Sequence, residues 1–359
     1  MKPIVFFLCA CGVSLAQQSQ GPGEKPGVTT PGVRISMARL QPDAVLPIAG
    51  MPDWIAIDAD VWVANEPRDS VVRIDPNRNV VVATIAVGKR PGAGLAAGFG
   101  SLWVPCCGES QLVRLDLATG AVTARIPTTI ADPEGSIAVG AGSVWLLTDA
   151  RGTLARFDPA TGTKIAEIAV ANGSYAAAFG EGAVWVTSTR DSVLSKVDVT
   201  TNRVAATIAV GKAPRFLAVG EGSVWTLNQG DGSITRVDPA RGAVLASIAP
   251  GIPGPGGEIA VGEGSVWVTA FEYPITRIDP RTNTVVQRFH GAGGDAIRVG
   301  HGSLWLSNLR AQNVWRLDPR KIAALSLGDT AASRARACTS RRSSYSRDPR
   351  PWPGTRLPC

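Results

Sequence analysis

Histidine is nearly absent from this 359-residue chain, which contains only His290 and His301. A zinc site built from several histidines needs at least two of them at a short spacing, so the sequence excludes that class of metal site. His301 falls in a glycine-flanked turn, whereas His290 lies in a connection that leads to Asp295. We therefore keep His290 as a candidate ligand-binding residue and predict neither a metal site nor a cofactor.

Long apolar runs are also missing, apart from one at the N-terminus. The body of the chain therefore contains no segment that could form a transmembrane helix. Phosphate-binding loops and dinucleotide fingerprints are absent as well, because the glycines follow a long repeat instead of marking a strand–helix junction. These absences remove the common classes of nucleotide-dependent enzyme.

Positive charge is concentrated at the C-terminus. The net charge is +7, and residues 320–359 carry nine basic and two acidic side chains, so residues 1–319 are neutral. The folded body thus shows no electrostatic preference for nucleic acid, and we predict no specific nucleic-acid binding. Residues 323–359 are rich in Ser, Arg and Pro without apolar periodicity, which predicts a disordered basic tail.

The N-terminus resembles a targeting segment. Lys2 precedes the apolar stretch Ile4–Val13, and Ala16 ends a small-x-small cleavage site. The pattern predicts a signal peptide over residues 1–16 and an exported protein, periplasmic or extracellular. A lipid anchor at Cys9 or Cys11 is the alternative to soluble export. Residues 17–40 are rich in Gln, Gly and Pro and predict a linker.

Seven repeats occupy the rest of the chain. Each contains a glycine-bounded strand with a central tryptophan, at Trp62, Trp103, Trp145, Trp185, Trp225, Trp267 and Trp305. An aspartate-containing turn follows each strand, at Asp75, Asp116, Asp158, Asp198, Asp238, Asp279 and Asp318. A repeat of about 40 residues with short strands is typical of one β-propeller blade.

One repeat resolves into four strands. In the fifth, we predict strand A at Phe216–Val219, strand B at Ser223–Asn228, strand C at Ser233–Asp238 and strand D at Ala243–Ile248. The 40 glycines and 26 prolines supply the turns, and a hydrophobic content of 45% supplies the core. The fold class is therefore all-β: a seven-bladed β-propeller of four-stranded antiparallel blades over residues 41–322, predicted to be monomeric.

The ends of the repeat predict how the ring closes. Six repeats place Gly or Asn four residues after the turn aspartate, where the backbone needs a positive φ, but the seventh places Ile322 there. Its last hairpin should therefore be missing. The segment Ala44–Ala49 resembles a strand D without its own blade, so we predict that this N-terminal strand completes blade 7.

The variable loops indicate where a ligand would bind. The D–A and B–C connections share one face of the ring, and the residue ten positions before each repeat tryptophan should lie at the channel mouth on that face. The candidate ligand-binding residues near this level are Asp53, Tyr175, Arg215, Glu258, His290 and Asp295. Such a mixed-charge set favours a small polar or zwitterionic ligand.

The repeats resemble those of the YVTN and streptogramin (virginiamycin B) lyase-like propellers of bacteria, over roughly residues 42–319. The resemblance implies a metal-dependent lyase that opens a cyclic depsipeptide ester by elimination. The lyase motifs, a Pro-His pair before strand A and Trp-Phe-Thr-Glu at the end of strand B, do not occur here. The family histidine positions fall on Arg215 and Gly257, and the family glutamate position falls on Ala270.

We therefore predict a non-catalytic ligand-binding or interaction scaffold, with a small polar ligand or a protein as its partner and no catalytic residues. The alternative is a lyase-like or other hydrolytic enzyme that uses the channel mouth. An acid/base pair beside a bound metal would favour the enzyme, whereas the missing lyase motifs favour the binding protein.

Overall fold

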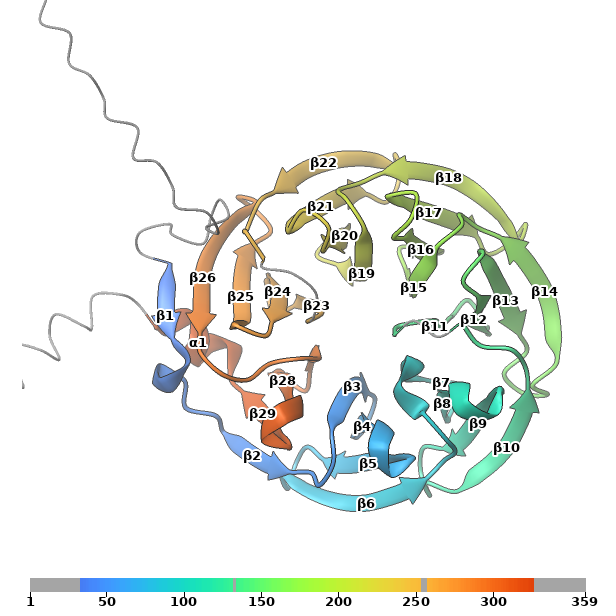
Figure 1. Cartoon of the computed structure of the whole chain (residues 1–359), viewed down its shortest axis with the longest axis horizontal. Helices are drawn as coiled ribbons and strands as arrows, with labels where there is room; N and C mark the ends of the chain where they lie inside the picture. Colours follow the sequence, from blue (N-terminus) through green and yellow to red (C-terminus); the bar gives the residue numbers. More distant parts are fainter. Residues whose placement is uncertain (1–32, 132–133, 253–256, 326–359) are drawn as a thin grey trace, which may run out of the picture.

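Seven β-sheets form a ring in the computed structural model, which describes residues 33–131, 134–252 and 257–325 (Figure 1). The predicted signal peptide, most of the linker, and residues 326–359 of the tail lie outside the described residues. Strand A of each blade lines the centre of the ring and strand D lies at its rim. The predicted seven-bladed, all-β fold is therefore confirmed.

Blades 1 to 4 each consist of four consecutive strands. Blade 1 contains β3 (Pro52–Ile57), β4 (Val61–Asn65), β5 (Ser70–Asp75) and β6 (Val80–Ala86). Blade 2 contains β7 (Ala96–Gly98), β8 (Ser101–Cys106), β9 (Gln111–Asp116) and β10 (Val122–Pro127). Blade 3 contains β11 (Ile137–Gly140), β12 (Ser143–Asp149), β13 (Thr153–Phe157) and β14 (Lys164–Ala169). Blade 4 contains β15 (Ser174–Gly180), β16 (Ala183–Ser188), β17 (Val193–Asp198) and β18 (Arg203–Ala209).

Blades 5 to 7 include the two blades that recruit an N-terminal strand. Blade 5 contains β19 (Pro214–Gly220), β20 (Ser223–Asn228), β21 (Ser233–Asp238) and β22 (Ala243–Ile248). Blade 6 contains β23 (Ile259–Gly262), β24 (Ser265–Ala270), β25 (Tyr273–Asp279), β26 (Thr284–His290) and β1 (Arg34–Ser36). Blade 7 contains β27 (Ile297–Gly300), β28 (Ser303–Asn308), β29 (Asn313–Leu317) and β2 (Ala44–Pro47).

Helical segments are short. The 3-10 helices are η1 (Met37–Arg39), η2 (Glu66–Arg68), η3 (Pro91–Ala93), η4 (Cys107–Glu109) and η5 (Leu309–Ala311), and α1 (Pro319–Ala324) follows the last strand. No helix among the described residues has the length and apolar character needed to span a bilayer.

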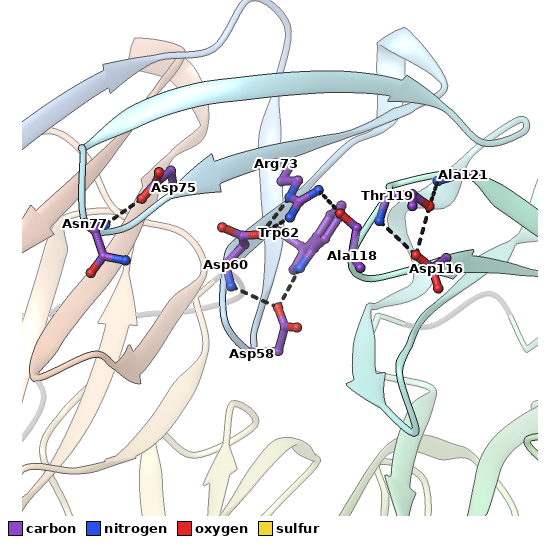
Figure 2. A network of polar contacts seen from close by, with 10 residues as sticks. All are labelled: Asp58, Asp60, Trp62, Arg73, Asp75, Asn77, Asp116, Ala118, Thr119 and Ala121. Atoms are coloured by element: carbon purple, nitrogen blue, oxygen red, sulfur yellow. Dashed lines mark hydrogen bonds and ion pairs between the residues drawn. The ribbon is translucent and has the colours of Figure 1, made fainter.

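The repeat tryptophan and a basic residue of strand C join neighbouring blades. In blade 1, the Arg73 guanidinium lies 5.2 Å from the centre of the Trp62 ring, forms an ion pair with Asp60, and donates to the Ala118 carbonyl oxygen of blade 2 at 2.9 Å (Figure 2). All seven repeat tryptophans are fully buried. The repeated motif therefore serves packing between blades, since each basic side chain covers one blade's tryptophan and five of the others also bond to the next blade's turn.

The aspartate turns behave as predicted. The Asp75 carboxylate accepts the backbone N–H of Asn77 at 2.8 Å and that of Arg78 at 3.1 Å. The residue four positions after the turn aspartate has a positive φ in blades 1 to 6, for example 54° at Asn79. In blade 7 this turn is replaced by helix α1, in which Ile322 is buried.

The N-terminal strand closes the ring. β2 pairs with β29 in antiparallel fashion, from Ala44 opposite Arg316 to Pro47 opposite Asn313. The Arg316 side chain then reaches blade 1, where it donates to the Pro76 carbonyl oxygen and to Asn79 Oδ1. Residues about 240 positions apart are thereby joined, and the predicted closure of blade 7 is confirmed.

A second N-terminal strand was not predicted. We placed Arg34–Ser36 in the linker, but it forms β1, which pairs with β26 in parallel as a fifth strand of blade 6. Ile35, Met37 and Leu40 are buried there. A three-residue strand has too little alternation to be recognised in the sequence, and its stability comes from this burial against blade 6.

Candidate functional site

The starts of the A strands gather charged side chains from five blades at one end of the channel. We call Asp53, Glu134, Tyr175, Arg215 and Asp295 the mouth cluster. Asp53 and Arg215 lie in the first two residues of β3 and β19, Tyr175 has the same place in β15, and Glu134 and Asp295 precede β11 and β27. Equivalent positions in a repeat converge around its axis, so residues from Asp53 to Asp295 become neighbours.

Arg215 holds one side of the mouth cluster together. Its Nη2 donates to Glu134 Oε2 at 3.0 Å, its Nε donates to the Tyr175 hydroxyl, and its Nη1 donates to Gln229 at 3.4 Å. The guanidinium also lies 4.9 Å from the centre of the Tyr175 ring. The ion pair of Arg215 is thus with Glu134, which lies in the loop before blade 3.

Two carboxyl groups meet on the other side. Asp53 and Asp295 lie close enough for each carboxyl group to influence the pKa of the other. Burial raises the pKa of Asp53 well above its usual value, and the neighbouring charge of Asp295 adds to the shift. Burial likewise raises the pKa of Asp295 to about 6. Both carboxyl groups therefore keep a proton to a higher pH than exposed aspartates do.

Glu258 lies deeper than the mouth cluster. It is 4% exposed, and Arg298 Nη1 donates to its Oε2. Burial raises the pKa of Glu258 to about 7, even though Arg298 opposes the shift. Glu134 also has a raised pKa because of burial, partly offset by Arg215.

Trp54 and Phe216 form an aromatic floor beneath the mouth cluster. Their ring centres are 6.0 Å apart, and Trp54 Nε1 donates to the Leu95 carbonyl oxygen at 3.2 Å. The indole extends from blade 1 to blade 3, where a Cβ on Gly135 would lie 2.7 Å from Trp54 Cη2. A glycine is needed at this position because the indole occupies the space of a side chain, and the floor separates the mouth cluster from the channel below.

The structure brings most of the candidate residues together. Asp53, Tyr175, Arg215 and Asp295 surround the mouth, and Glu258 lies just below them. His290 does not join them, because it is the last residue of β26 and is paired with Ser36 of β1 on the rim of blade 6. Its pKa is lowered by desolvation and by Arg34.

Sequence analysis missed Arg298 and Trp54. Arg298 pairs with the repeat tryptophan of blade 7, and in each of the other six blades the residue that pairs with the repeat tryptophan from strand A is alanine. These residues are Ala56, Ala96, Ala138, Ala178, Ala218 and Ala260. Comparing that column of the repeat would have singled out Arg298. Among the described residues, no group of three or more His, Cys, Asp or Glu side chains is arranged to hold a metal ion.

Comparison with solved structures identifies the fold. A streptogramin B lyase structure superposes with a TM-score of 0.62 at 19% identity, covering 76% of this chain and 94% of that one. Virginiamycin B lyase from Staphylococcus aureus gives a TM-score of 0.63 at 15% identity, covering 77% of this chain and 98% of that one. The same values describe a catalytically inactive histidine-to-alanine variant of the S. aureus enzyme with quinupristin.

No protein-family model matches the chain, and no curated protein sequence matches it. At these identities the superpositions establish the architecture and leave the chemistry to be argued from the site. The ring of seven blades and the superpositions together identify the chain as a β-propeller of the streptogramin lyase-like fold.

Proposed function

We propose that this chain is an exported, non-catalytic binding protein whose mouth cluster holds a small polar ligand that carries an amine. The observation that supports it most is the position of the Asp53 and Asp295 carboxyl groups at the starts of neighbouring blades 1 and 7, in the same mouth cluster as the Arg215–Glu134 ion pair.

The charge balance favours a cationic group. The mouth and the layer below it contain four carboxyl groups, and Arg215 and Arg298 are already paired with Glu134 and Glu258. Within the part of the chain that the structure describes, Asp53 and Asp295 form no ion pair. An ammonium group can donate to both carboxylates, and these bonds gain strength from the half-buried surroundings.

A zwitterionic ligand would use the opposite side as well. The Tyr175 hydroxyl and the Arg215 guanidinium are held in place by their mutual hydrogen bond and by Glu134. An anionic group placed above Arg215 would meet a preorganised donor, which lowers the entropic cost of binding.

The second candidate is a hydrolytic enzyme that uses the same mouth. The Asp53 and Asp295 carboxyl groups favour it, since two neighbouring carboxyl groups with raised and different pKa values can act as general acid and general base. Streptogramin lyase-type elimination is less well supported, because Arg215, Gly257 and Ala270 replace the residues of the lyase motifs.

A thermal-shift screen of amino acids, amines and short peptides tests the proposal. We expect an amine-bearing compound to raise the melting temperature, because a ligand that binds only the folded state stabilises it. The effect should be lost in Asp53→Asn and kept in Glu167→Gln, a control on an exposed side chain of the rim strand β14. A panel without any stabilising amine would refute the proposal, and conversion of the bound compound would favour the enzyme.

A further inference from the structure

A second hollow lies below the aromatic floor, on the opposite side from the mouth cluster. It has a volume of about 280 Å³ and runs between the A strands of blades 3 to 7. At its inner end lie Trp54, Phe216 and Glu258, which are buried. At its outer end Val139, Val219 and Val261 are half-exposed, so this channel opens on the face of the A–B turns.

The channel is lined mostly by alanine and valine side chains, and its two charged residues are Glu258 and Arg298. Alanine and valine side chains of four blades line it at two successive levels, at Ala138, Val139, Ala178, Ala218, Val219, Ala260 and Val261. At the alanine level, blade 7 places Arg298. A charged side chain in an apolar channel is costly to desolvate, so a residue placed there in a single blade suggests a specific partner.

Arg298 is fixed in place and still has donors to offer. Its guanidinium lies 4.3 Å from the centre of the Trp54 ring, which orients its plane. Its Nη1 donates to Glu258 and, at 2.6 Å, to the Ile297 carbonyl oxygen. Within the described part of the chain, Nε and Nη2 donate no hydrogen bond, and the side chain keeps 22% of its exposure.

We propose that this channel binds a linear aliphatic carboxylic acid, with the carboxylate on Arg298 and the alkyl chain along the alanine and valine walls. The planar guanidinium suits a carboxylate, and the alanine and valine side chains suit an alkyl chain. At about 30 Å³ per water-sized group, the channel volume holds roughly nine such groups, close to the size of octanoate. Trp54 and Phe216 lie between this site and the mouth cluster, and Glu258 links the two because Asp295 and Glu134 act on its pKa.

Glu258 makes the binding depend on pH. Its carboxyl faces Arg298 and Asp295 from the start of blade 7 and Glu134 from the loop before blade 3. An incoming carboxylate competes with Glu258 for Arg298, so the bound state favours a protonated Glu258. Since the pKa of Glu258 is about 7 in the free protein and aliphatic acids ionise well below pH 6, affinity should fall about tenfold from pH 6 to pH 8.

Titration calorimetry of the full exported chain with octanoate tests this inference. We expect one bound octanoate per chain, proton uptake on binding, and weaker binding at the higher pH. Octanol, which has the same chain without the charge, should bind at least tenfold more weakly.

Two variants locate the site. Arg298→Leu should weaken octanoate binding roughly ten- to hundredfold, whereas Arg241→Leu, on a side chain that is 80% exposed, should not change it. Ala218→Leu should block the channel, whereas the same substitution at the exposed turn residue Ala240 should not. If Arg298→Leu fails to fold, Ala218→Leu still decides. No binding by the unaltered chain at about 1 mM octanoate, or binding that Ala218→Leu leaves unchanged, would overturn the proposal.

Discussion

Substituting Leu46 by Ala tests how much the closing strand stabilises the ring. Leu46 lies in β2, is 3% exposed, and packs in a cluster with Ile48, Trp305 and Val314. Its neighbour Val45 is 50% exposed on the other side of the same strand. Both substitutions leave the backbone pairing of β2 with β29 in place, so the pair isolates the burial of one side chain.

The expected destabilisation follows from the cavity that Leu46→Ala creates. Buried Leu-to-Ala changes cost about 3 to 5 kcal/mol, and an edge strand can relax, so we expect about 3 kcal/mol. Val45→Ala should change the free energy of unfolding by less than about 0.5 kcal/mol. Urea unfolding followed by tryptophan fluorescence measures both, since Trp305 lies in the same cluster.

Equal effects of the two substitutions would refute the role we assign to β2. As a second test, removing residues 17–50 deletes both β1 and β2, and with them the partner strand of β29. The truncated chain should unfold at a much lower temperature. An unchanged melting temperature would show that the ring closes without its N-terminal strands.

Three further predictions concern the floor, the carboxyl pair and the ring contact. Gly135→Ala should destabilise the protein by about 2 kcal/mol more than Gly142→Ala in thermal unfolding, because both glycines have a positive φ but only Gly135 packs against an indole. Equal losses would mean that Trp54 moves aside at little cost in free energy. The pKa of Asp295 is raised to about 6, so the folded chain binds more protons than the unfolded chain between about pH 4 and 6 and stability falls as pH rises through that range. Asp295→Asn should flatten this fall and gain about 1 to 2 kcal/mol at neutral pH, and an unaltered pH profile of unfolding would disprove the shift. Arg316→Met should cost about 2 kcal/mol in urea unfolding through its lost bonds to blade 1, and a loss below about 0.5 kcal/mol would count against this contact.

The seven-bladed ring could be predicted from the sequence because each repeated residue has a structural role within its own blade or at the contact with the next blade. The tryptophan fills the space between blades, the basic residue covers it, and the aspartate ends strand C by accepting backbone N–H groups. The failure of this pattern at Ile322 correctly predicted the missing hairpin and its replacement by β2. The position of a residue within the repeat also placed Asp53, Arg215 and Asp295 at one level.

Side-chain contacts between different blades across the channel could not be predicted from the sequence. Which acid pairs with Arg215 depends on the loop before blade 3, whose length and course the repeat does not determine. Trp54 was missed because its indole reaches two blades away, and His290 was misplaced because pairing with β1 extends β26 to include it. Tertiary packing determines each of these placements, and none of them produces a repeating pattern in the sequence.

Native mass spectrometry of the exported protein tests the central proposal most directly, in the unaltered chain and in Arg215→Ala. We predict one small polar molecule with an amine and an anionic group bound to the unaltered chain, and its loss in Arg215→Ala, which removes the donor for the anionic group. An empty mouth in the unaltered chain, together with a large loss of stability in Arg215→Ala, would contradict the proposal and leave Arg215 as a structural tie to Glu134.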